Sequence, residues 1–427
     1  MKTFLADNLS DKKLQQLFYR PSGNNERVAK SVKRILKAVK QDGDKALFLY
    51  ANKFDGVKNV CLLISKNEID NEAARTKPDL KRAILLAAKN ITKFHSKQKP
   101  KDYSVETMKG VECQRKFLPI ENVGLYVPGG SAVLFSTMLM LGIPAKIAGC
   151  KRIVVCSPVK EKLMPELAYA AKIIGVDEFY NIGGAQAIGM MAYGTKSAAK
   201  VDKIFGPGNQ YVTEAKTFVS RDPNGCLIDM PAGPSEVLVI ADDKACPSFV
   251  AADLLSQAEH GTDSQVILLT TSGRLAEEVN IEIKLQLELL NRSKTAKECL
   301  NNSFILIVDS VDEAVKLSNF YAPEHLIISA ANAEKYLSKI VNAGSVFVGA
   351  FSPESAGDYA SGTNHSLPTY GYAKAIGGVT VESFMKTVTF QKLSKNGLQN
   401  ISDTVIKMAE AEGLYAHANA VKVRLKK

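Results

Sequence analysis

The chain contains 427 residues, of which 46% are hydrophobic, and it carries a formal net charge of +11. This length allows two or three domains with sizeable cores, and the lysines are spread along the chain without a basic helix interleaved with aromatic residues, which argues against a nucleic-acid partner. The longest apolar run, residues 132–148, is interrupted by Ser136, Pro144 and Lys146, so we expect no membrane span.

The amino terminus and the cysteines both favour a cytoplasmic protein. The first 18 residues hold no long apolar core and no small-residue cleavage pattern, so we expect no export signal. The 7 cysteines are scattered and no pair has CxxC spacing, which argues against a disulfide framework and against a cysteine zinc site.

The first part of the chain is predicted to be helical. An arm over residues 1–25 contains one short helix, for which Asn8 or Ser10 offers an N-cap. Residues 26–101 place apolar side chains at spacings of three and four, which is typical of amphipathic helices. His95 lies on one of these helices among lysines, and we interpret it as a solvated surface residue.

From residue 123 onward, short apolar strands alternate with helices. RIVVCSPV, EFYNIGG and KVDKIF read as strands that are each followed by a helical stretch, and EVLVIA, SQVILLT, NSFILIV and HLIISA continue the alternation to about Ala350. Repeated βα units of this kind predict parallel sheets. The predicted fold class is therefore α/β, with two Rossmann-like αβ units on parallel sheets and helical N-terminal and C-terminal arms.

The changes of pattern also predict domain boundaries. We expect residues 1–25 to form an N-terminal arm and residues 381–427 to form a C-terminal helical segment. Between them, we expect residues 26–125 to be a helical segment that packs with residues 230–380 in one α/β domain, and residues 126–229 to form a second α/β domain.

The stretch DLLSQAEHG, residues 253–261, is predicted to be the end of a helix. On a helix Asp253, Gln257 and His260 share one stripe, and Gly261 is a natural stop. Such a stripe presents an amide and an imidazole to one point. Taken alone, however, the pattern is more typical of a half-exposed helix whose polar face meets water.

Two further histidines lie in connecting segments. His325 follows Glu324 in a proline-fixed turn before an apolar strand, which is a usual place for an acid–base pair, although an exposed turn fits equally well. His365 lies in a long polar loop, seven positions after Asp358. Loops of this length and composition are more often functional or mobile than structural.

His417 lies on the last predicted helix, where a lone histidine is usually a packing residue. Together with Gln257, His260 and Asp358 it would supply two nitrogen and two oxygen donors. Imidazole and carboxylate are ordinary zinc ligands, whereas an amide oxygen is an uncommon one. Because these residues lie far apart in the sequence, their spacing leaves a metal site open.

Three glycine-rich stretches each follow a predicted strand: PGGSA at 128–132, NIGGAQAIG at 181–189 and FGPGN at 205–209. Backbone N–H groups and helix N-termini at such turns bind phosphate groups. The GxGxxG pattern with a downstream acidic residue is absent, and close packing of backbone explains any single turn as well.

Eight long blocks, in order from about residue 20 to the C-terminus, resemble the histidinol dehydrogenase family. They are GLYVPGGSAVLFSTMLMLGIPAKIAGC, NIGGAQAIGMMAYGT, VDKIFGPGNQYVTEAK, IDMPAGPSEVLVIAD, DLLSQAEHG, YAPEHL, GDYASGTNHSLPT and EGLYAHANAVKVR. Their number and order make the resemblance far more specific than any one glycine motif.

This resemblance implies a zinc-dependent homodimer that oxidises L-histidinol to L-histidine through an enzyme-held aldehyde, in two NAD-linked steps that end histidine biosynthesis. It implies one zinc ion per subunit and a site that the partner's C-terminal segment completes at the dimer interface. The domain at 126–229 would contact NAD.

The resemblance also assigns roles to individual residues. The zinc ligands would be Gln257, His260, Asp358 and His417. The acid–base pair would be Glu324 and His325. The substrate would be bound by Ser235, Gln257, His260, His325, Asp358, His365, Glu412 and His417. The NAD contacts would be Tyr126, Gln186 and Asn209, one from each glycine-rich stretch.

Two other classes of function remain as alternatives. A metal-dependent hydrolase could use the same donors without NAD, with a metal-bound water as the nucleophile. A non-catalytic binding protein could use the basic surface and would not depend on His260. Neither alternative accounts for both the glycine turns and the four donors.

Overall fold

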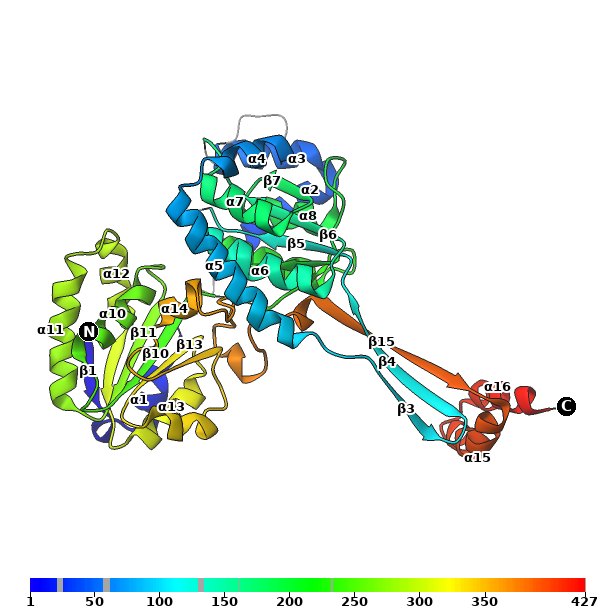
Figure 1. Cartoon of the computed structure of the whole chain (residues 1–427). Coiled ribbons are helices and arrows are strands. Elements are labelled where there is room, and N and C mark those ends of the chain that lie inside the picture. The colour runs from blue at the N-terminus through cyan, green and yellow to red at the C-terminus, as the bar shows by residue number, and fades with distance from the viewer. Residues whose placement is uncertain (21–25, 57–61, 130–133, 160, 232, 427) are drawn as a thin grey trace.

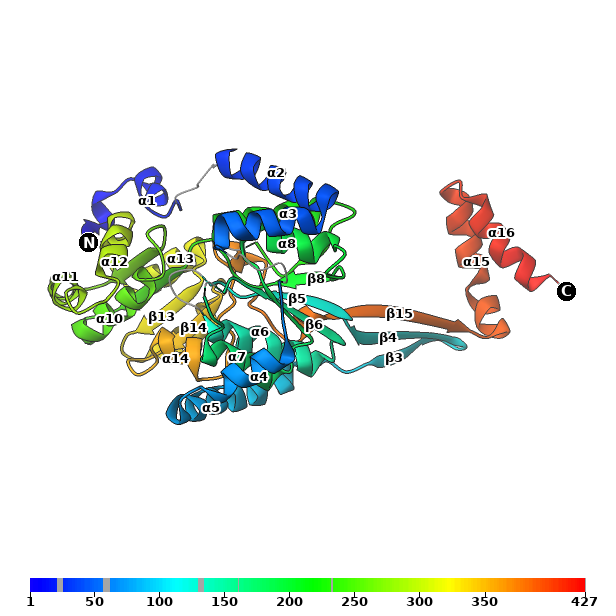
Figure 2. The same ribbon diagram turned by 90° about the horizontal axis from the view of Figure 1, so that it is seen from above.

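The computed structural model describes residues 1–20, 26–56, 62–129, 134–159, 161–231 and 233–426. Figure 1 shows two α/β bodies side by side and a long arm that projects from them. The N-terminus lies in one body, and the C-terminus lies at the tip of the arm. Figure 2, a view from above, shows the same separation of the arm from both bodies.

The first body is built on a six-stranded parallel sheet in the order β1-β12-β11-β10-β13-β14. Its strands are β1 (Lys2–Leu5), β10 (Glu236–Ala241), β11 (Gln265–Thr270), β12 (Phe304–Ile307), β13 (His325–Ser329) and β14 (Ser345–Val348). Its helices are α1 (Asp11–Leu17), α10 (Pro247–Ala258), α11 (Gly273–Leu287), α12 (Ser293–Cys299), α13 (Val311–Tyr321) and α14 (Glu354–Tyr359).

Both faces of this sheet are buried. Val237 and Val239 of β10 pack with α10 and α11, whereas Leu238 and Ile240 pack toward α13 on the other face. Successive residues of a strand point to opposite faces, so a strand covered on both sides must be apolar throughout. The continuous run EVLVIA therefore belongs to a central strand.

The second body contains a six-stranded sheet in the order β2-β7-β6-β5-β8-β9, parallel except for β2. Its strands are β2 (Leu63–Ile64), β5 (Asn122–Tyr126), β6 (Arg152–Ser157), β7 (Glu178–Asn181), β8 (Lys203–Phe205) and β9 (Leu227–Ile228). Its helices are α2 (Glu26–Asp42), α3 (Asp44–Tyr50), α4 (Lys66–Ala74), α5 (Pro78–His95), α6 (Phe135–Ala148), α7 (Pro165–Ile174), α8 (Gly184–Tyr193) and α9 (Gln210–Arg221).

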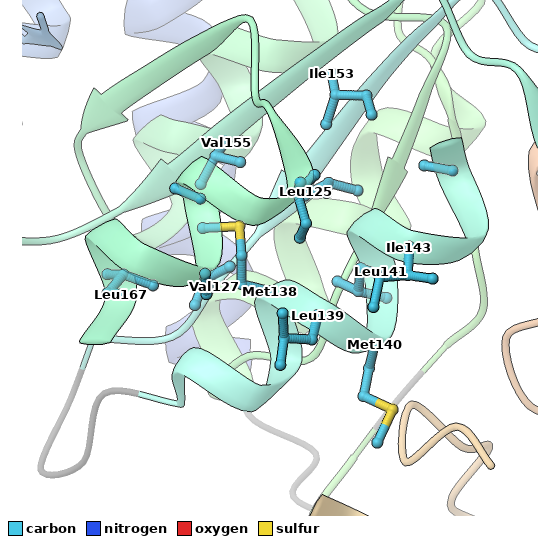
Figure 3. Packing of buried hydrophobic residues seen from close by; sticks show 14 of the residues in the cluster. Leu125, Val127, Met138, Leu139, Met140, Leu141, Ile143, Ile153, Val155 and Leu167 are labelled. Carbon is cyan, nitrogen blue, oxygen red and sulfur yellow. The ribbon is translucent and has the colours of Figure 1, made fainter. Parts of the chain in front are cut away.

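The core on one face of this second sheet is formed between β5, β6, α6 and α7. Figure 3 shows Leu125, Ile153 and Val155 from the strands against Met138 and Leu141 of α6. The α/β fold class with parallel sheets, predicted from the alternating pattern, is confirmed.

The predicted packing of residues 26–125 with residues 230–380 is wrong. Helix α2 packs against α8 and α9, α4 packs against α7, and α5 packs against α6. All of these partners lie in the second body, where β2 also pairs with β7. Gly189 of α8 shows one physical reason, because a Cβ there would lie 3.1 Å from Leu36 of α2. The missing side chain lets α2 approach α8 closely.

The arm is a three-stranded antiparallel sheet in the order β15-β4-β3, followed by two helices. Its elements are β3 (Tyr103–Met108), β4 (Val111–Pro119), β15 (Met385–Leu393), α15 (Lys395–Ala411) and α16 (Tyr415–Leu425). The segments 26–125 and 381–427 were predicted to be helical, but each of them also contributes strands to this sheet. Strand β15 pairs with β4 from a distant part of the sequence, and a local pattern does not reveal such pairing.

Two smaller predictions also differ from the structure. The N-terminal arm holds the predicted helix α1 after Ser10, but its first residues form β1, which pairs with β12. His95 is fully buried, and its Nδ1 lies 2.6 Å from Gln98 Oε1, so it is not a solvated residue. Among the described residues, no helix combines the length and apolarity that a bilayer crossing requires.

Candidate active site

The end of α10 places Gln257 and His260 at the amino-terminal ends of β10 and β13. The helix ends at Ala258, and His260 follows in a turn in which its N–H donates to the Gln257 carbonyl at 3.2 Å. The predicted helical stripe therefore stops before His260, and Gly261 does not adopt the left-handed conformation of a helix stop. Gln257 is buried, whereas His260 is exposed on the surface of the chain.

Glu324 and His325 lie at the start of β13 and are buried, so the exposed-turn interpretation does not hold. Helix α13 ends at Tyr321, and its C-cap, Ala322, adopts a left-handed conformation with φ of 55°. The main chain of Glu236 lies beside the pair. Its N–H donates to Glu324 Oε2 at 2.9 Å, and its carbonyl lies 3.2 Å from His325 Nδ1.

The Gln257 amide lies against this pair. Its Nε2 is 3.0 Å from His325 Nδ1, 3.4 Å from the Glu236 carbonyl and 3.5 Å from Glu324 Oε2. Its Oε1 is buried without a hydrogen-bond partner. Because buried polar atoms are nearly always paired, a buried amide oxygen without a partner is a good candidate for a ligand of a bound group.

His325 also forms a cluster with Glu354 and Asp358, in which the potential ligand atoms lie within 4.8 Å of one another. His325 Nε2 is 3.7 Å from Asp358 Oδ1. Glu354 is 1% exposed, and its Oε2 has no partner. Glu354 was not singled out from the sequence, although its position four residues before Asp358 on one helix was a signal for it.

The charges of this cluster shift its protonation equilibria. Burial lowers the pKa of His325, but the carboxylates of Glu354, Glu324 and Asp358 together raise it by more than burial lowers it. The pKa of His325 therefore lies well above its ordinary value. Burial raises the pKa of Glu354 to about 8 and also raises that of Glu324. Asp358 has a lowered pKa, because its interactions with the His325 imidazolium outweigh its burial. The site therefore holds groups that can accept and release protons near neutral pH.

His365 joins this cluster to the second body. Its Nδ1 lies 3.0 Å from the Asp358 carbonyl, and its Nε2 lies 3.1 Å from Thr137 Oγ1. Thr137 lies in the first turn of α6, which follows β5. Ser235 immediately precedes β10 and is half-buried. The roles of His365 and Ser235 in binding a substrate stay predictions.

The predicted NAD contacts lie at the carboxyl ends of β5, β7 and β8. The strand order reverses between β5 and β8, which is the usual ligand crevice of such sheets. Tyr126 ends β5 and its hydroxyl accepts from the Gly184 N–H at 3.0 Å, while Gln186 Nε2 donates to Asp55 Oδ2 at 3.1 Å. Asn209 caps α9 by accepting from the N–H of Tyr211 and Val212. Tyr126 and Gln186 therefore lie together.

One of the three glycine stretches is described only in part. Residues 130–132 of the PGGSA turn lie outside the described residues. In the FGPGN turn, Gly206 has a φ of 119°, and a Cβ there would lie 2.1 Å from the Tyr126 carbonyl oxygen. This glycine allows the backbones after β5 and β8 to approach each other at the reversal point.

Two predicted site residues are not brought to the cluster within one chain. Glu412 is the C-cap of α15, and His417 lies in the first turn of α16. Figures 1 and 2 show both helices at the tip of the arm, far from β13 and α14. Both residues are exposed, so His417 is not a packing residue of its own chain.

The geometry can be compared with known proteins. A family model for histidinol dehydrogenase matches residues 18–425. Histidinol dehydrogenase from Haemophilus influenzae is 53% identical over 428 residues, and the alignment covers 100% of this chain and 99% of that protein. The corresponding values for histidinol dehydrogenase from Aliivibrio fischeri are 51%, 100% and 97%. A crystal structure of histidinol dehydrogenase from Elizabethkingia anophelis matches with a TM-score of 0.95 at 50% identity, covering 100% of this chain and 98% of that chain. The resemblance inferred from the sequence blocks is confirmed.

Proposed function

Because the chain belongs to the histidinol dehydrogenase family of oxidoreductases, we propose that it oxidises L-histidinol to L-histidine in two NAD-linked steps. This reaction would be the last step of histidine biosynthesis, and we place it in the cytoplasm. The observation that carries the proposal is the buried Glu324–His325 pair, which is in contact with the main chain of Glu236 and the amide of Gln257. Such a pair suits proton removal from an alcohol.

His325 would act as the base in the first oxidation. Hydride leaves the carbinol carbon only as the hydroxyl proton is removed, and the neutral form of His325, whose buried Nε2 has no hydrogen-bond partner, would accept that proton. The product of this step is the aldehyde, with one NAD reduced.

The second oxidation adds water to the aldehyde. Glu324 would remove a proton from that water, with His325 as the further proton acceptor, and the resulting hydrate would lose hydride to a second NAD. Burial raises the pKa of Glu324, which makes its carboxylate a stronger base than an exposed one. NAD, when bound, accepts the hydride in both steps.

The donors in the site fit zinc, and we propose that Gln257, His260 and Asp358 hold it together with His417 of the partner subunit. The partnerless Gln257 Oε1 supports this set, as does the convergence of Asp358 with His325 and Glu354. Zinc, when bound, would orient the imidazole and amine of the substrate and would offset the carboxylate charge that raises the pKa of His325.

NAD would bind at the carboxyl edge of the second sheet, in contact with Tyr126, Gln186 and Asn209. The order of the strands supports this position, because the reversal between β5 and β8 is the usual place for such a ligand. The bond between His365 and Thr137 brings this edge next to the Asp358 cluster. Hydride donor and acceptor could therefore meet between the two bodies.

A homodimer would complete the site. His417 and Glu412 are exposed on the projecting arm, where they contact nothing in their own active site. Next to α14, Phe351 is 91% exposed and its ring lies 6.3 Å from that of Phe249 on α10, which leaves an apolar surface beside the cluster. We propose that the arm of the partner covers this surface, with His417 as a zinc ligand and Glu412 as a contact of the substrate together with Ser235 and His365.

The test is to measure NADH formed per L-histidinol consumed, with and without a chelator. We expect two NADH per histidinol, loss of turnover with the chelator, and recovery when zinc is added. One NADH per histidinol would contradict the water step assigned to Glu324. No change in nicotinamide absorbance in the zinc-loaded protein would overturn the proposed activity and would favour a metal-dependent hydrolase.

A further inference from the structure

A buried ion pair lies directly behind the Glu324–His325 turn. Arg20 Nε lies 2.5 Å from Glu236 Oε1, and Arg20 Nη2 lies 2.8 Å from Glu236 Oε2, so the contact is bidentate. The two side chains are 14% and 3% exposed. A buried carboxylate needs such a partner, because an unpaired charge in this environment is strongly disfavoured.

The same guanidinium also holds the turn that leads to the catalytic pair. It stacks 3.8 Å above the ring of Tyr321, and its Nη2 donates to the carbonyls of Tyr321 at 2.9 Å and Ala322 at 3.2 Å. Ala322 has a φ of 55°, which alanine rarely adopts. Residues in such conformations persist only where the surroundings determine them. Arg20 supplies two of the hydrogen bonds that do so.

Glu236 connects this ion pair to the reacting groups. Its side chain faces Arg20, and its Oε1 also accepts from the Tyr370 N–H at 2.8 Å. Its main chain faces the site, where the N–H donates to Glu324 and the carbonyl lies against Gln257 and His325. The position of one residue therefore orients Glu324, His325 and Gln257 at once.

We infer that Arg20 is a positioning residue for the Glu324–His325 pair. The bidentate contact fixes Glu236, whose N–H donates to Glu324 and whose carbonyl lies against His325 Nδ1, so that both side chains are held in place for the substrate. This inference rests on the proposed function of the pair. The competing explanation is that Arg20 only fastens the N-terminal arm to the first body and so contributes to stability alone.

Two variants and a matched control separate these explanations. Arg20→Met removes the charge and all four hydrogen bonds, and Arg20→Lys keeps the charge but loses the bidentate geometry. Arg152→Met is the control, because Arg152 forms a bidentate pair with Glu178 in the second body, away from the site. For each protein we would measure Tm, kcat, the KM for histidinol and the ring 15N signals of His325, identified by their loss in His325→Asn.

We expect Arg20→Met to lower kcat about 100-fold with a change in KM of less than about 3-fold, because misplaced catalytic groups slow the chemical step more than binding. Arg20→Lys should show an intermediate loss, and methylguanidinium should partly restore Arg20→Met. The His325 ring signals should move in both Arg20 variants but not in Arg152→Met, which should lower Tm alone.

Near-normal kcat and unmoved His325 signals in the Arg20 variants, with a fall in Tm like that of Arg152→Met, would overturn the inference. If Arg20→Met does not fold, the same comparison is made with Arg20→Lys. If the unmodified protein does not oxidise histidinol, the proposed function fails, but the His325 signals still decide whether Arg20 positions that ring.

Discussion

Three buried side-chain atoms without hydrogen-bond partners lie together in this protein: Gln257 Oε1, His325 Nε2 and Glu354 Oε2. A buried polar atom without a partner costs about 1–3 kcal/mol of stability, so a cluster of them is explained best by a group that binds there. The amide nitrogen of Gln257, by contrast, has partners: the Glu236 carbonyl, Glu324 Oε2 and His325 Nδ1. Unsatisfied buried groups of this kind are typical of sites that bind a substrate or a metal.

At this residue scale the two members of the proposed catalytic pair should have separable roles. His325→Asn should lower the turnover of both oxidations by about 10²–10⁴-fold, because it removes the proposed general base. Glu324→Gln should retain part of the first oxidation and lose the second, so that NADH per histidinol falls toward one. The turnover and the ratio of NADH to histidinol are both obtained by measuring NADH and histidine in the same reaction. Glu277→Gln, exposed on α11, serves as the control, and near-normal turnover in both site variants would remove the pair from the mechanism.

At the scale of elements, β6 and β7 are joined by an ion pair as well as by their ladder. Arg152 donates to both oxygens of Glu178, at 2.6 Å and 3.0 Å, and also to the carbonyls of Ala199 and Lys200. The Tyr180 hydroxyl donates to Glu178 Oε2 at 2.7 Å. The side chains of Arg152 and Glu178 are 18% and 26% exposed, so this network is partly shielded from water.

This network predicts a pH-dependent stability. The hydrogen bonds from Arg152 lower the pKa of Glu178 below 4.5 despite its partial burial, so its contribution is complete above the unfolded-state pKa and is lost as the pH falls through the lower folded-state value. Glu178→Gln should cost about 1–2 kcal/mol at pH 7. The difference in Tm from the unmodified protein should narrow as the pH falls below 4.5. An unchanged difference at acid pH would show that the charge of Glu178 is not what stabilises the strand pair.

At the scale of the whole molecule, the arm is the feature that a single chain does not explain. Strands β3, β4 and β15 carry α15 and α16 well away from both bodies (Figure 1). Large apolar side chains on the arm, including Tyr415 at 69% and Met408 at 60% exposure, face solvent in the isolated chain. Exposed apolar surface of this kind marks an interaction site, which is consistent with a partner subunit.

A shared site predicts complementation between two inactive variants. His260→Asn and His417→Asn should each abolish zinc binding and turnover, because each removes a donor from every site. When the two are co-expressed, half of the dimers are mixed, and each mixed dimer has one site with both histidines, so activity should recover to about one quarter of normal. Zinc content should recover in parallel. Co-expression of two differently tagged His260→Asn chains is the control, and no recovery in the mixture would mean that each site is built from one chain.

The sequence alone predicted the alternating strands and helices of the two α/β bodies, the family, and a set of candidate site residues. Alternation of apolar strands with helices reports burial on both faces of a sheet, so it identified parallel α/β bodies without a template. The order of the motif blocks identified the family. A proline-fixed turn before an apolar strand singled out Glu324 and His325, and their burial agrees with a functional role.

Only the tertiary structure decided how these parts meet. An amphipathic stripe shows that a helix has a partner but not which one, so the pattern of α2 does not predict that it packs against Gly189 of α8 in the second body. Strand β15 depends on β4 across the chain, and Arg20 reaches Glu236 across 216 positions. Periodicity and propensity are local properties, whereas these contacts depend on distances between segments that are remote in sequence. The contacts that bring the site residues together therefore form only when the chain folds, and no local sequence pattern predicts them.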